Sequence, residues 1–367
     1  MRILFDHQIY SNQKYGGISR YFYELAKGLT SLGEECTNSI FLSDNEFVQD
    51  KTMFTAREMP SVNFKGKGAL KKYLNRKVSE KIMRRGNFDL LHPTYYDTYF
   101  LGKKPTSLPF VVTFYDLIHE KFGEKFPGSL KDLDKVIADR KALIKEASRV
   151  IAISESTKND IIEFYGVDPA KIDVTYLASS MPSTNLLKSD ELGPYILYVG
   201  NRSDYKNFRN YAESIRPLLV KEPTLRLVCA GGGELSQSEI EFINSLHLSR
   251  QIIQMPINDS ILAKLYHNAI CFVFPSLYEG FGIPALEAFS CGCPAILSDR
   301  SSLPEVGADA ALYVNPEDKA DMLDKTERFF YDDQMRQAYT ARGLDQVKRF
   351  SWDRMAIETL NIYKGAL

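Results

Sequence analysis

Cysteine is scarce in this sequence of 367 residues. The five cysteines are odd in number and contain no Cys-x-x-Cys pair, so neither a disulfide scaffold nor a zinc site is indicated, and a reducing compartment is favoured. An excess of either charge is also missing, because 46 Lys and Arg face 47 Asp and Glu. A net charge of −1 gives no global reason to expect nucleic acid as a partner.

Long apolar runs are absent as well. The stretch 269–274 is among the longest, and it is far shorter than the roughly 18–20 residues that a membrane-spanning helix needs. Asp6 follows the first five residues, which leaves too short an apolar run for a signal peptide. We therefore expect a soluble, cytoplasmic protein that can still bind to the surface of a membrane.

The composition is that of an ordinary globular protein, 44% hydrophobic and 25% charged, and the length suggests two or three domains of roughly 150 residues each. Short apolar runs alternate with longer amphipathic ones. Strands are predicted at 2–6, 38–42, 88–91, 109–114, 149–153, 172–177, 195–199, 224–230, 251–254, 270–274, 294–298 and 311–314. Helices are predicted near 17–32, 68–85, 129–147, 155–165, 207–220, 236–246, 258–268, 284–291 and 318–349.

Apolar strands separated by helices are typical of parallel sheets covered on both faces. Two such sets predict two doubly wound α/β domains, 1–185 and 186–349, with the boundary in the small, polar stretch 179–194 that carries Pro and Gly. Two such domains facing each other would leave a cleft. Ligands of open α/β sheets bind at the carboxyl ends of the strands, so the chemistry is sought in the loops that follow strands.

The loop 275–282 follows one such strand and leads into a predicted helix with Pro284 in its first turn. Proline is preorganised for that position, and the amides of Ala285 and Leu286 would then face a ligand with the positive end of the helix dipole, which favours an anion. Glu279 and Glu287 flank this anion site and can accept hydrogen bonds from sugar hydroxyls. Taken singly, Glu279 is explained equally well as a solvated loop acid, and Glu287 as a first-turn residue that the helix dipole favours, with no ligand required.

The string EGFGIPALEA at 279–288, followed by GCPA at 292–295, resembles the signature of glycosyltransferase family 4. That family consists of retaining, metal-independent enzymes of GT-B fold, in which two Rossmann-like domains face a central cleft and a nucleotide sugar is the donor. The resemblance implies an acceptor-binding domain at 1–185, a nucleotide-sugar-binding domain at 186–349, and a C-terminal helix at 350–367 that packs back on the first domain. It also implies that no cofactor and no metal is required.

The resemblance extends to the loop after the first strand of each domain. YGGISRY at 15–21 is similar to the family's glycine loop, and in the family the backbone at Gly16 and Gly17 lies near the donor diphosphate. GNRSDYKN at 200–207 is similar to the basic loop, in which Arg202 and Lys206 would neutralise the charge that develops on the leaving nucleoside diphosphate. Alone, the first loop is also consistent with a simple turn into a helix, and the second with a solvated surface.

A third loop departs from the family pattern. Relatives often have His-Asp after the strand at 109–114, with the histidine near the reacting sugar, whereas this chain has Tyr115 and Asp116, and His119 three residues later. Either Tyr115 or His119 is predicted to take the place of that histidine. A purely structural role for a lone histidine stays open.

The remaining donor contacts that the resemblance implies are mostly to the backbone. Met255 falls where relatives hold the base, Glu287 would bind the ribose, and Glu279 would hold the donor sugar. The other residues implied in donor binding are Phe281, Gly282, Ile283 and Leu286. The glycine turn at 231–233 lacks the Gly-x-Gly-x-x-Gly spacing of an NAD site. Asp132 and Asp134 lie in a predicted helix and not in a loop after a strand, which disfavours metal-dependent GT-A chemistry.

The stretch 64–86 is strongly basic, with nine Lys and Arg and the single acid Glu80. Its apolar residues recur at steps of three and four, which predicts a helix with one apolar and one cationic face. Such a helix can lie on an anionic bilayer, or it can pack on the core with a solvated, charged back. The two interpretations are equally consistent with the pattern, and the family resemblance favours the membrane.

Together these features predict a retaining glycosyltransferase that moves a mannose- or glucose-like hexose from a GDP- or UDP-sugar to a glycan or lipid-linked saccharide acceptor in surface polysaccharide synthesis. No nucleic acid is expected as a partner. Two alternatives stay open: another GT-B activity, such as a sugar-nucleotide epimerase or a phosphorylase, and a non-catalytic GT-B scaffold subunit.

Overall fold

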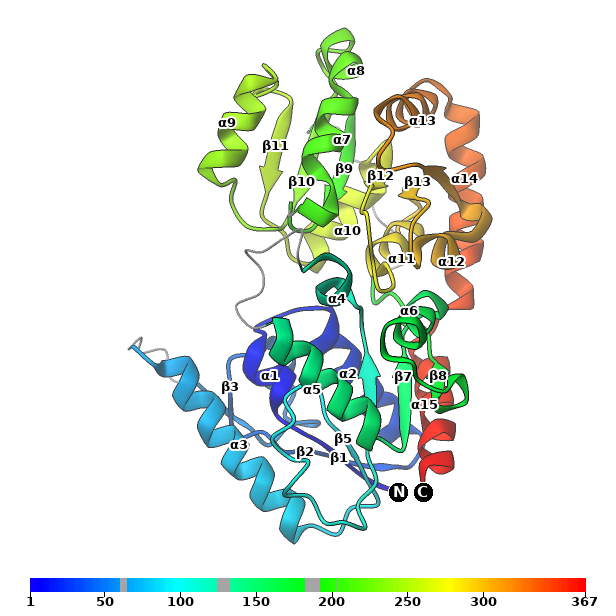
Figure 1. Ribbon diagram of the computed structural model, residues 1–367. Coiled ribbons are helices and arrows are strands. Elements are labelled where there is room, and N and C mark those ends of the chain that lie inside the picture. Colours follow the sequence, from blue (N-terminus) through cyan, green and yellow to red (C-terminus); the bar gives the residue numbers. More distant parts are fainter. Residues whose placement is uncertain (60–64, 124–132, 182–191, 203) are drawn as a thin grey trace. The chain divides into compact units, whose positions relative to one another are not determined.

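The computed structural model describes residues 1–59, 65–123, 133–181, 192–202 and 204–367, which form two compact units. Unit 1 comprises 1–177 and 352–367, and unit 2 comprises 178–351 (Figure 1). The predicted domain boundary at residue 185 and Asp132 of the discounted metal pair lie outside the described residues. The chain re-enters unit 1 at Trp352, two residues after the predicted start of the C-terminal segment.

Unit 2 is built on a parallel sheet of six strands in the order β11-β10-β9-β12-β13-β14. The strands are β9 (Tyr195–Val199), β10 (Arg226–Ala230), β11 (Ile252–Met255), β12 (Cys271–Phe274), β13 (Ala295–Ser298) and β14 (Ala311–Val314). The strand order reverses between β9 and β12, which are paired through Leu197 and Phe272. The loops that follow these two strands therefore leave the same edge of the sheet side by side, at the place where open α/β sheets bind ligands.

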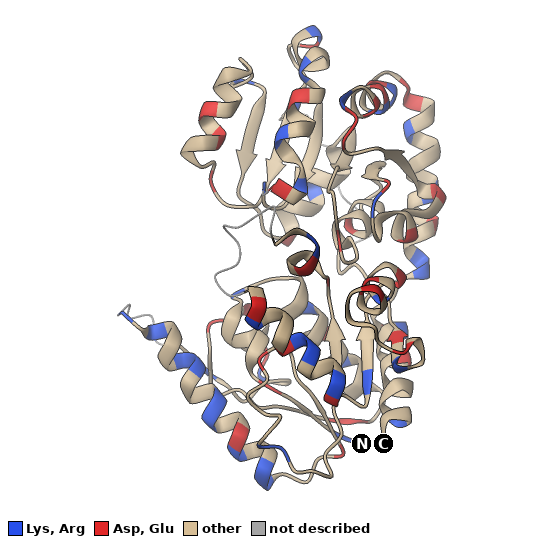
Figure 2. Ribbon diagram, viewed as in Figure 1, with Lys and Arg blue, Asp and Glu red and all other residues tan. Residues whose placement is uncertain are grey.

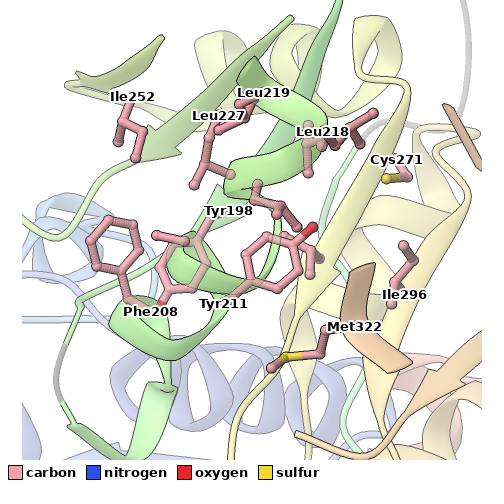
Figure 3. Packing of buried hydrophobic residues seen from close by; sticks show 14 of the residues in the cluster. Tyr198, Phe208, Tyr211, Leu218, Leu219, Leu227, Ile252, Cys271, Ile296 and Met322 are labelled. Carbon is pink, nitrogen blue, oxygen red and sulfur yellow. The ribbon is translucent and has the colours of Figure 1, made fainter. Parts of the chain in front are cut away.

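Helices cover this sheet and bury its core. They are α7 (Phe208–Ser214), α8 (Arg216–Lys221), α9 (Gln237–Ser245), α10 (Asp259–Asn268), α11 (Ile283–Ser290), α12 (Leu303–Gly307), α13 (Lys319–Tyr331) and α14 (Asp333–Gln346). Figure 3 shows Tyr198 and Leu227 of the sheet packed with Phe208 and Tyr211 of α7 and Met322 of α13, all buried. This packing of apolar side chains fixes the strand ends from which the loops emerge.

Unit 1 has two three-stranded parallel sheets, β2-β1-β5 and β6-β7-β8, linked by a parallel bridge between Leu91 and Phe110. Their strands are β1 (Arg2–Phe5), β2 (Glu35–Asn38), β5 (Leu90–His92), β6 (Val111–Phe114), β7 (Arg149–Ala152) and β8 (Ile172–Val174), and a short pair is formed by β3 (Leu42–Ser43) and β4 (Arg57–Glu58). The order reverses between β1 and β5. Two Rossmann-like units are thus present, as predicted.

The helices of unit 1 are α1 (Gln8–Asn12), α2 (Gly17–Ser31), α3 (Lys67–Arg85), α4 (Ile118–Phe122), α5 (Leu133–Glu146), α6 (Glu155–Tyr165) and α15 (Trp352–Ala366). The C-terminal helix α15 packs on α2 so closely that a Cβ added at Gly28 would lie 2.5 Å from Cβ of Ala356. Its Tyr363 hydroxyl also hydrogen bonds to His92 of β5. The C-terminal segment is therefore an integral part of unit 1.

Three predicted elements are wrong in their bounds. The strand predicted at 38–42 is replaced by β2 at Glu35–Asn38, which pairs with β1, and by the two residues of β3. The helix predicted at 207–220 is two helices, because Pro217 has no N–H to continue the bonding of α7 and lies instead in the first turn of α8, which begins at Arg216. The helix predicted at 318–349 is interrupted at Asp332, whose extended backbone ends α13 while its carboxylate caps α14.

Helix α3 matches its predicted range, but it faces the protein differently. The residues that it buries are Lys71, Asn75, Ser79, Glu80 and Met83, four of them polar, whereas Leu70 and Tyr73 are 44% and 57% exposed. The prediction that an apolar face opposes a cationic one is therefore wrong. Figure 2 shows Lys and Arg recurring along the whole helix. Within the described residues, no helix is both long and apolar enough to cross a bilayer.

Candidate active site

An ion pair lies at the carboxyl end of the unit 2 sheet, where the strand order reverses. Lys206, at the end of a single 3-10 turn (Asp204–Lys206) after β9, approaches Glu279 of the loop after β12, with 2.6 Å between Nζ and Oε1. The two side chains are 15% and 11% exposed. The Lys206 ammonium also lies 5.0 Å from the centre of the Phe274 ring. A cation and a carboxylate are thus held together at the position expected for a ligand.

Hydrogen bonds fix the two loops to each other. The Leu277 amide donates to the Tyr205 carbonyl over 2.8 Å, which ties the backbone of one loop to that of the other. Asn207 has a left-handed backbone, with φ of 62°, and its side-chain amide donates to the carbonyls of Pro275 and Pro316. Asparagine tolerates this conformation better than most residues do. Asn207, the residue after Lys206, therefore holds the loop that carries Lys206 in a fixed conformation.

Glu279 is held from the neighbouring strand β13. Its amide donates to Ser301 Oγ over 2.8 Å, while the Ser302 hydroxyl is within 2.9 Å of the Glu279 carbonyl and 2.8 Å of the Phe281 carbonyl. Neither serine stands in a motif that the sequence pattern marks. The available signal was their position in the loop that follows an apolar strand, β13, which neighbours β12 in the sheet.

The start of α11 differs in detail from the prediction. Gly282 precedes the helix with φ of 108°, and a Cβ there would lie 2.7 Å from Leu303, so both conformation and space favour glycine. The amide of Ala285 donates to the Gly282 carbonyl over 2.9 Å, and Ala285 and Leu286 are buried. The prediction that the Ala285 amide is available to an anion is therefore wrong. Ile283, the first helical residue, is only half-buried.

Glu287 lies one turn into α11. Its carboxylate accepts a hydrogen bond of 3.2 Å from the hydroxyl of the buried Tyr266 in α10. Burial and this carboxylate together raise the pKa of Tyr266 well above its ordinary value, so the phenol stays a donor. The side chain of Glu287 is half-buried, and its predicted contact with a ribose stays a prediction.

Arg202 is engaged inside the protein. Its Nε donates to Glu239 over 2.6 Å, and its terminal nitrogens reach the carbonyls of the glycine turn 231–233 and of Glu234. Its side chain is only 2% exposed. Burial alone would raise the pKa of Glu239, but hydrogen bonds from Ser236 and Arg202 lower it. The Arg202 guanidinium therefore links the glycine turn to the capping box at the start of α9. A diphosphate could contact this guanidinium only in addition to the hydrogen bonds that it already makes within the protein.

Met255 ends β11, where the base was predicted to bind. Its carbonyl accepts the amide of Gly231 over 2.9 Å, so one backbone group at this position is already hydrogen bonded to the glycine turn. Gly231 has φ of 74°, and a Cβ there would lie 2.9 Å from Ile257. The turn and the end of β11 are thus packed closely against each other.

In unit 1, the glycine loop forms the start of α2. Gly16 precedes the helix, its carbonyl accepts from the Arg20 amide and the Ser19 hydroxyl, and Gly17 is the first helical residue. A Cβ at Gly16 would meet the side chain of Gln13 at 2.7 Å. Gly17 is exposed, so the amino end of this 15-residue helix is accessible from solvent.

The loop after β6 is built on a buried ion pair. The Arg140 side chain of α5 is 2% exposed and donates from Nη1 to both carboxylate oxygens of Glu120, at 2.8 and 2.6 Å. The same nitrogen donates to the Asp116 carbonyl over 3.2 Å, and the guanidinium lies 4.3 Å from the centre of the Tyr96 ring. Arg140 therefore holds the backbone of the loop in place, although it stands in no recognisable sequence motif.

The two residues considered as replacements for the family histidine differ in their surroundings. The Tyr115 ring is 5% exposed and packs against Tyr21 and Tyr96, so its hydroxyl would have to leave this aromatic cluster to contact a sugar. His119 is half-buried, and its Nδ1 has no hydrogen-bond partner in the part of the chain that the structure describes. Burial, and next the Arg140 charge, lower the pKa of His119, so the ring is neutral at pH 7. The Tyr115 hydroxyl also has no hydrogen-bond partner among the described residues, so the choice between the two residues stays a prediction.

The predicted site residues thus divide between the units. Unit 2 brings Lys206 and Glu279 into contact and holds Phe281, Gly282, Ile283, Leu286 and Glu287 in the segment that directly follows. Arg202 and Met255 lie instead at the glycine turn. Unit 1 holds Gly16 and Gly17 at the start of α2, and Tyr115, Asp116 and His119 after β6.

Two family models match the chain, and together they span most of it. Residues 15–178 match the model described as Glycosyltransferase Family 4, and residues 185–346 match the one described as Glycosyl transferases group 1. O-antigen chain mannosyltransferase B of Escherichia coli is 33% identical over 273 residues, which cover 69% of this chain and 70% of that protein.

Solved structures share the fold at low sequence identity. Sucrose-phosphate synthase from Thermosynechococcus elongatus is 18% identical with a TM-score of 0.76, and the match covers 100% of this chain and 99% of that one. HepE of Anabaena, solved in complex with UDP and glucose, is 15% identical with a TM-score of 0.71 and 99% of each chain covered.

Proposed function

The chain belongs to glycosyltransferase family 4, and from this premise we propose that it is a retaining hexosyltransferase whose donor binds at the Lys206–Glu279 pair. It is a glycosyltransferase of GT-B fold. The proposed donor is a GDP- or UDP-linked hexose, and the proposed acceptor is a glycan or lipid-linked saccharide of a surface polysaccharide. The relative from Escherichia coli is named as an O-antigen mannosyltransferase, which supports mannose and this acceptor class.

The observation that carries the proposal is the ion pair at the point where the unit 2 sheet reverses its strand order. A diphosphate leaving group gains negative charge as the glycosidic bond breaks, and a preorganised cation there lowers the barrier. Lys206 is held by its loop and shielded from most solvent, and its partner Glu279 lies in the loop that leads into α11. In water the same cation would stabilise the leaving group far less.

The pair also suggests how the two residues share the donor. Glu279 neutralises Lys206 over 2.6 Å, so a diphosphate that binds Lys206 must compete with that carboxylate. Once Lys206 contacts phosphate oxygens, Glu279 can accept hydrogen bonds from the hydroxyls of the donor sugar. We propose that the acceptor hydroxyl attacks from the face of the leaving group and passes its proton to the donor phosphate, so that no protein base and no metal is needed.

Activity measurements on two variants test this assignment. Glu279→Ala and Lys206→Ala are each expected to lower kcat more than tenfold, because each removes a charge-assisted hydrogen bond worth about 1.5–3 kcal/mol at the reacting groups. Lys319→Ala serves as the control, since Lys319 pairs with Glu213 on the exposed surface of unit 2. Circular dichroism verifies that the variants fold. Turnover at the level of the parent in both site variants would remove the assignment.

Analysis of the reaction product tests the retaining, metal-independent mechanism and separates a transferase from an epimerase. Proton NMR of the product is expected to show the anomeric configuration of the donor, and activity is expected to persist in EDTA. Incubating donor without acceptor gives no glycoside for a transferase, whereas an epimerase would convert the donor alone. Loss of activity in EDTA, or an inverted product, would contradict the proposed mechanism.

We also propose a cytoplasmic enzyme that docks on anionic bilayers through the exposed side of α3. Leu70 and Tyr73 are exposed and flank the exposed Lys72, which places apolar groups able to enter the interface beside a basic residue. Lys and Arg recur along the rest of the helix (Figure 2). Each basic residue near anionic lipid contributes about 1 kcal/mol. This interpretation differs from the sequence-based one in that the apolar contact is made by these two residues and not by a whole face.

Liposome flotation with phosphatidylglycerol vesicles tests the docking. The triple variant Lys81/Arg84/Arg85→Glu changes exposed residues and is expected to lose most of the floating fraction. Lys71 is kept, because it is buried and forms an ion pair with Asp44, so that its loss would disturb the fold. Equal flotation of the parent and the triple variant would contradict membrane docking by α3.

A further inference from the structure

Unit 1 has a cavity of its own at the point where the β2-β1-β5 sheet reverses its strand order. Its volume is about 290 Å³, near the lower end of the range for small-molecule sites. The wall is formed by residues that follow β1, by residues that follow β5, and by one side of α3. The residues of the wall include His7, Ser11, Lys72, Arg76, Tyr95 and Asp97.

The wall of this cavity is rigidly built. The Asp6 carboxylate, 1% exposed, accepts from the amide and the hydroxyl of Thr94, both over 2.8 Å, and so clamps the loop after β1 to the loop after β5. The Gln8 side chain accepts from the Asp97 amide over 2.7 Å and donates to its carbonyl over 3.0 Å. Both groups satisfy buried backbone atoms, which makes the cavity a preformed feature and not a gap between mobile loops.

A buried histidine in the wall has an unused polar atom. His7 is 6% exposed, its Nδ1 lies 3.0 Å from Ser11 Oγ, and that oxygen accepts a hydrogen from Asn75 of α3 over 2.8 Å. The Ser11 hydroxyl can satisfy both neighbours by donating to His7 Nδ1, which places the ring hydrogen on Nε2. Nε2 is buried, and among the described residues nothing accepts its hydrogen. An orphan donor of this kind points to a missing acceptor.

The remaining wall adds two cations and one carboxylate. Lys72 is exposed and makes no hydrogen bond within the described part of the chain. Arg76 donates from Nε to Glu80 over 3.1 Å, and its guanidinium lies 5.2 Å from the centre of the Tyr99 ring. Its terminal nitrogens make no hydrogen bond to the described residues. Asp97 is exposed, and its Oδ1 accepts the Tyr99 amide over 2.9 Å. Donors thus outnumber acceptors, a combination that suits an anion with attached hydroxyl groups.

We propose that this cavity binds the phosphate of a phosphorylated saccharide, with Lys72, Arg76 and His7 donating to phosphate oxygens and Asp97 accepting from a sugar hydroxyl. The ligand is an acceptor or acceptor fragment, and in that respect the inference rests on the proposed transferase function. The ring of Tyr95 lies in the same wall and offers an apolar face to the sugar.

Binding of glucose 6-phosphate to the full chain, measured by calorimetry without donor, tests the inference. Glucose 6-phosphate is expected to bind, and glucose at the same concentration is not. Lys72→Met and Arg76→Met are each expected to weaken binding at least fivefold, about 1 kcal/mol. Lys81→Met, an exposed lysine of the same helix outside the cavity wall, is expected to leave it unchanged. Equal binding by the parent and Lys72→Met would overturn the site.

Two further measurements test the role of His7 and the saccharide part of the ligand separately. The ¹⁵N signal of His7 Nε2 is expected to show a protonated nitrogen and to move when glucose 6-phosphate is added, and a signal that stays in place would exclude His7. Inorganic phosphate is expected to bind more weakly than the sugar ester, and equal affinities would overturn the saccharide part of the proposal. None of these readouts uses turnover. The experiments can therefore contradict the proposed ligand of the cavity without contradicting the proposed transferase function, and the activity measurements can do the reverse.

Discussion

Two cations in the loop after β9 show how local surroundings decide a residue's role. Lys206 forms an ion pair with Glu279, and a diphosphate would compete with that carboxylate. Arg202 has a carboxylate partner and several carbonyls, and its side chain is almost wholly buried. Displacing those bonds would remove the donor to the carbonyls of the glycine turn and leave Glu239 with only its hydrogen bonds from Ser236, at a cost of several kcal/mol. Lys206 is therefore the cation that can respond to a diphosphate.

His92 offers a test at the residue scale that does not depend on function. It is fully buried in β5, and burial lowers its pKa from 6.5 to about 3. Between these values the unfolded chain binds a proton at this residue and the folded chain does not. The free energy of unfolding of unit 1 is therefore expected to fall as the pH falls below about 6.5, by up to about 1.4 kcal/mol per pH unit from this residue.

Urea unfolding followed by the fluorescence of the single tryptophan, Trp352 in α15 of unit 1, measures this effect. The His92→Asn variant serves as the comparison, because Asn does not titrate. Its free energy of unfolding is expected to vary less steeply between pH 4 and 6 than that of the parent. Parallel pH profiles would show that His92 is protonated in the folded state as readily as in the unfolded one.

Sequence patterns found Lys206 and Glu279 because both follow apolar strands and stand in recognisable motifs. They could not show that Arg202 is engaged internally, since its partner Glu239 lies 37 positions further along the chain. The same holds for Tyr115, whose burial depends on Tyr21 and Tyr96 from two other segments. Contacts between distant segments decide which of several plausible side chains is available, and local spacing does not contain them.

At the scale of the element, α3 is fixed to unit 1 by a polar contact. Asn75, fully buried, accepts from the amides of Phe41 and Leu42 and donates to the Leu42 carbonyl and the Ser11 hydroxyl. These bonds satisfy the backbone at Phe41 and Leu42, where the chain passes from β2 into the two-residue strand β3. They explain both the orientation of α3 and the failure of the strand predicted at 38–42.

Asn75→Ala is accordingly expected to lower the free energy of unfolding by about 2–4 kcal/mol, because it leaves several buried backbone groups without partners. Lys81→Ala, at an exposed position of the same helix, is expected to change it by less than about 0.5 kcal/mol. Urea titrations of both variants provide the comparison. A loss below about 1 kcal/mol for Asn75→Ala would mean that apolar contacts, and not this amide, dock the helix.

Most helices and strands could be predicted from periodicity, and two of the failures share a cause. The apolar pattern of 207–220 and of 318–349 continues through Pro217 and Asp332, although one helix ends and the next begins near each of these residues. The bounds of α3 followed from its periodicity, but the face that it buries did not, because buried Asn75 and Ser79 count as polar in any such pattern.

At the scale of the whole molecule, each unit repeats one device. A parallel sheet reverses its strand order, and the two loops at the reversal are hydrogen bonded to each other: Leu277 to Tyr205 in unit 2, and Thr94 to Asp6 in unit 1. One reversal holds the Lys206–Glu279 pair, and the other holds the cavity with His7. The alternation of strands and helices predicted the parallel sheets of the two units. Which side chains meet where each strand order reverses could be seen only in the structure.

The most direct test of the central claim is calorimetric titration of the parent and of Lys206→Met with UDP and GDP. One of these nucleotides is expected to bind the parent, and Lys206→Met is expected to bind it at least tenfold more weakly, since about 1.5–3 kcal/mol is lost with a charge-assisted hydrogen bond. Lys319→Met, away from the pair, is expected to bind like the parent. Unaltered affinity in Lys206→Met, or no binding of either nucleotide by the parent, would contradict the account.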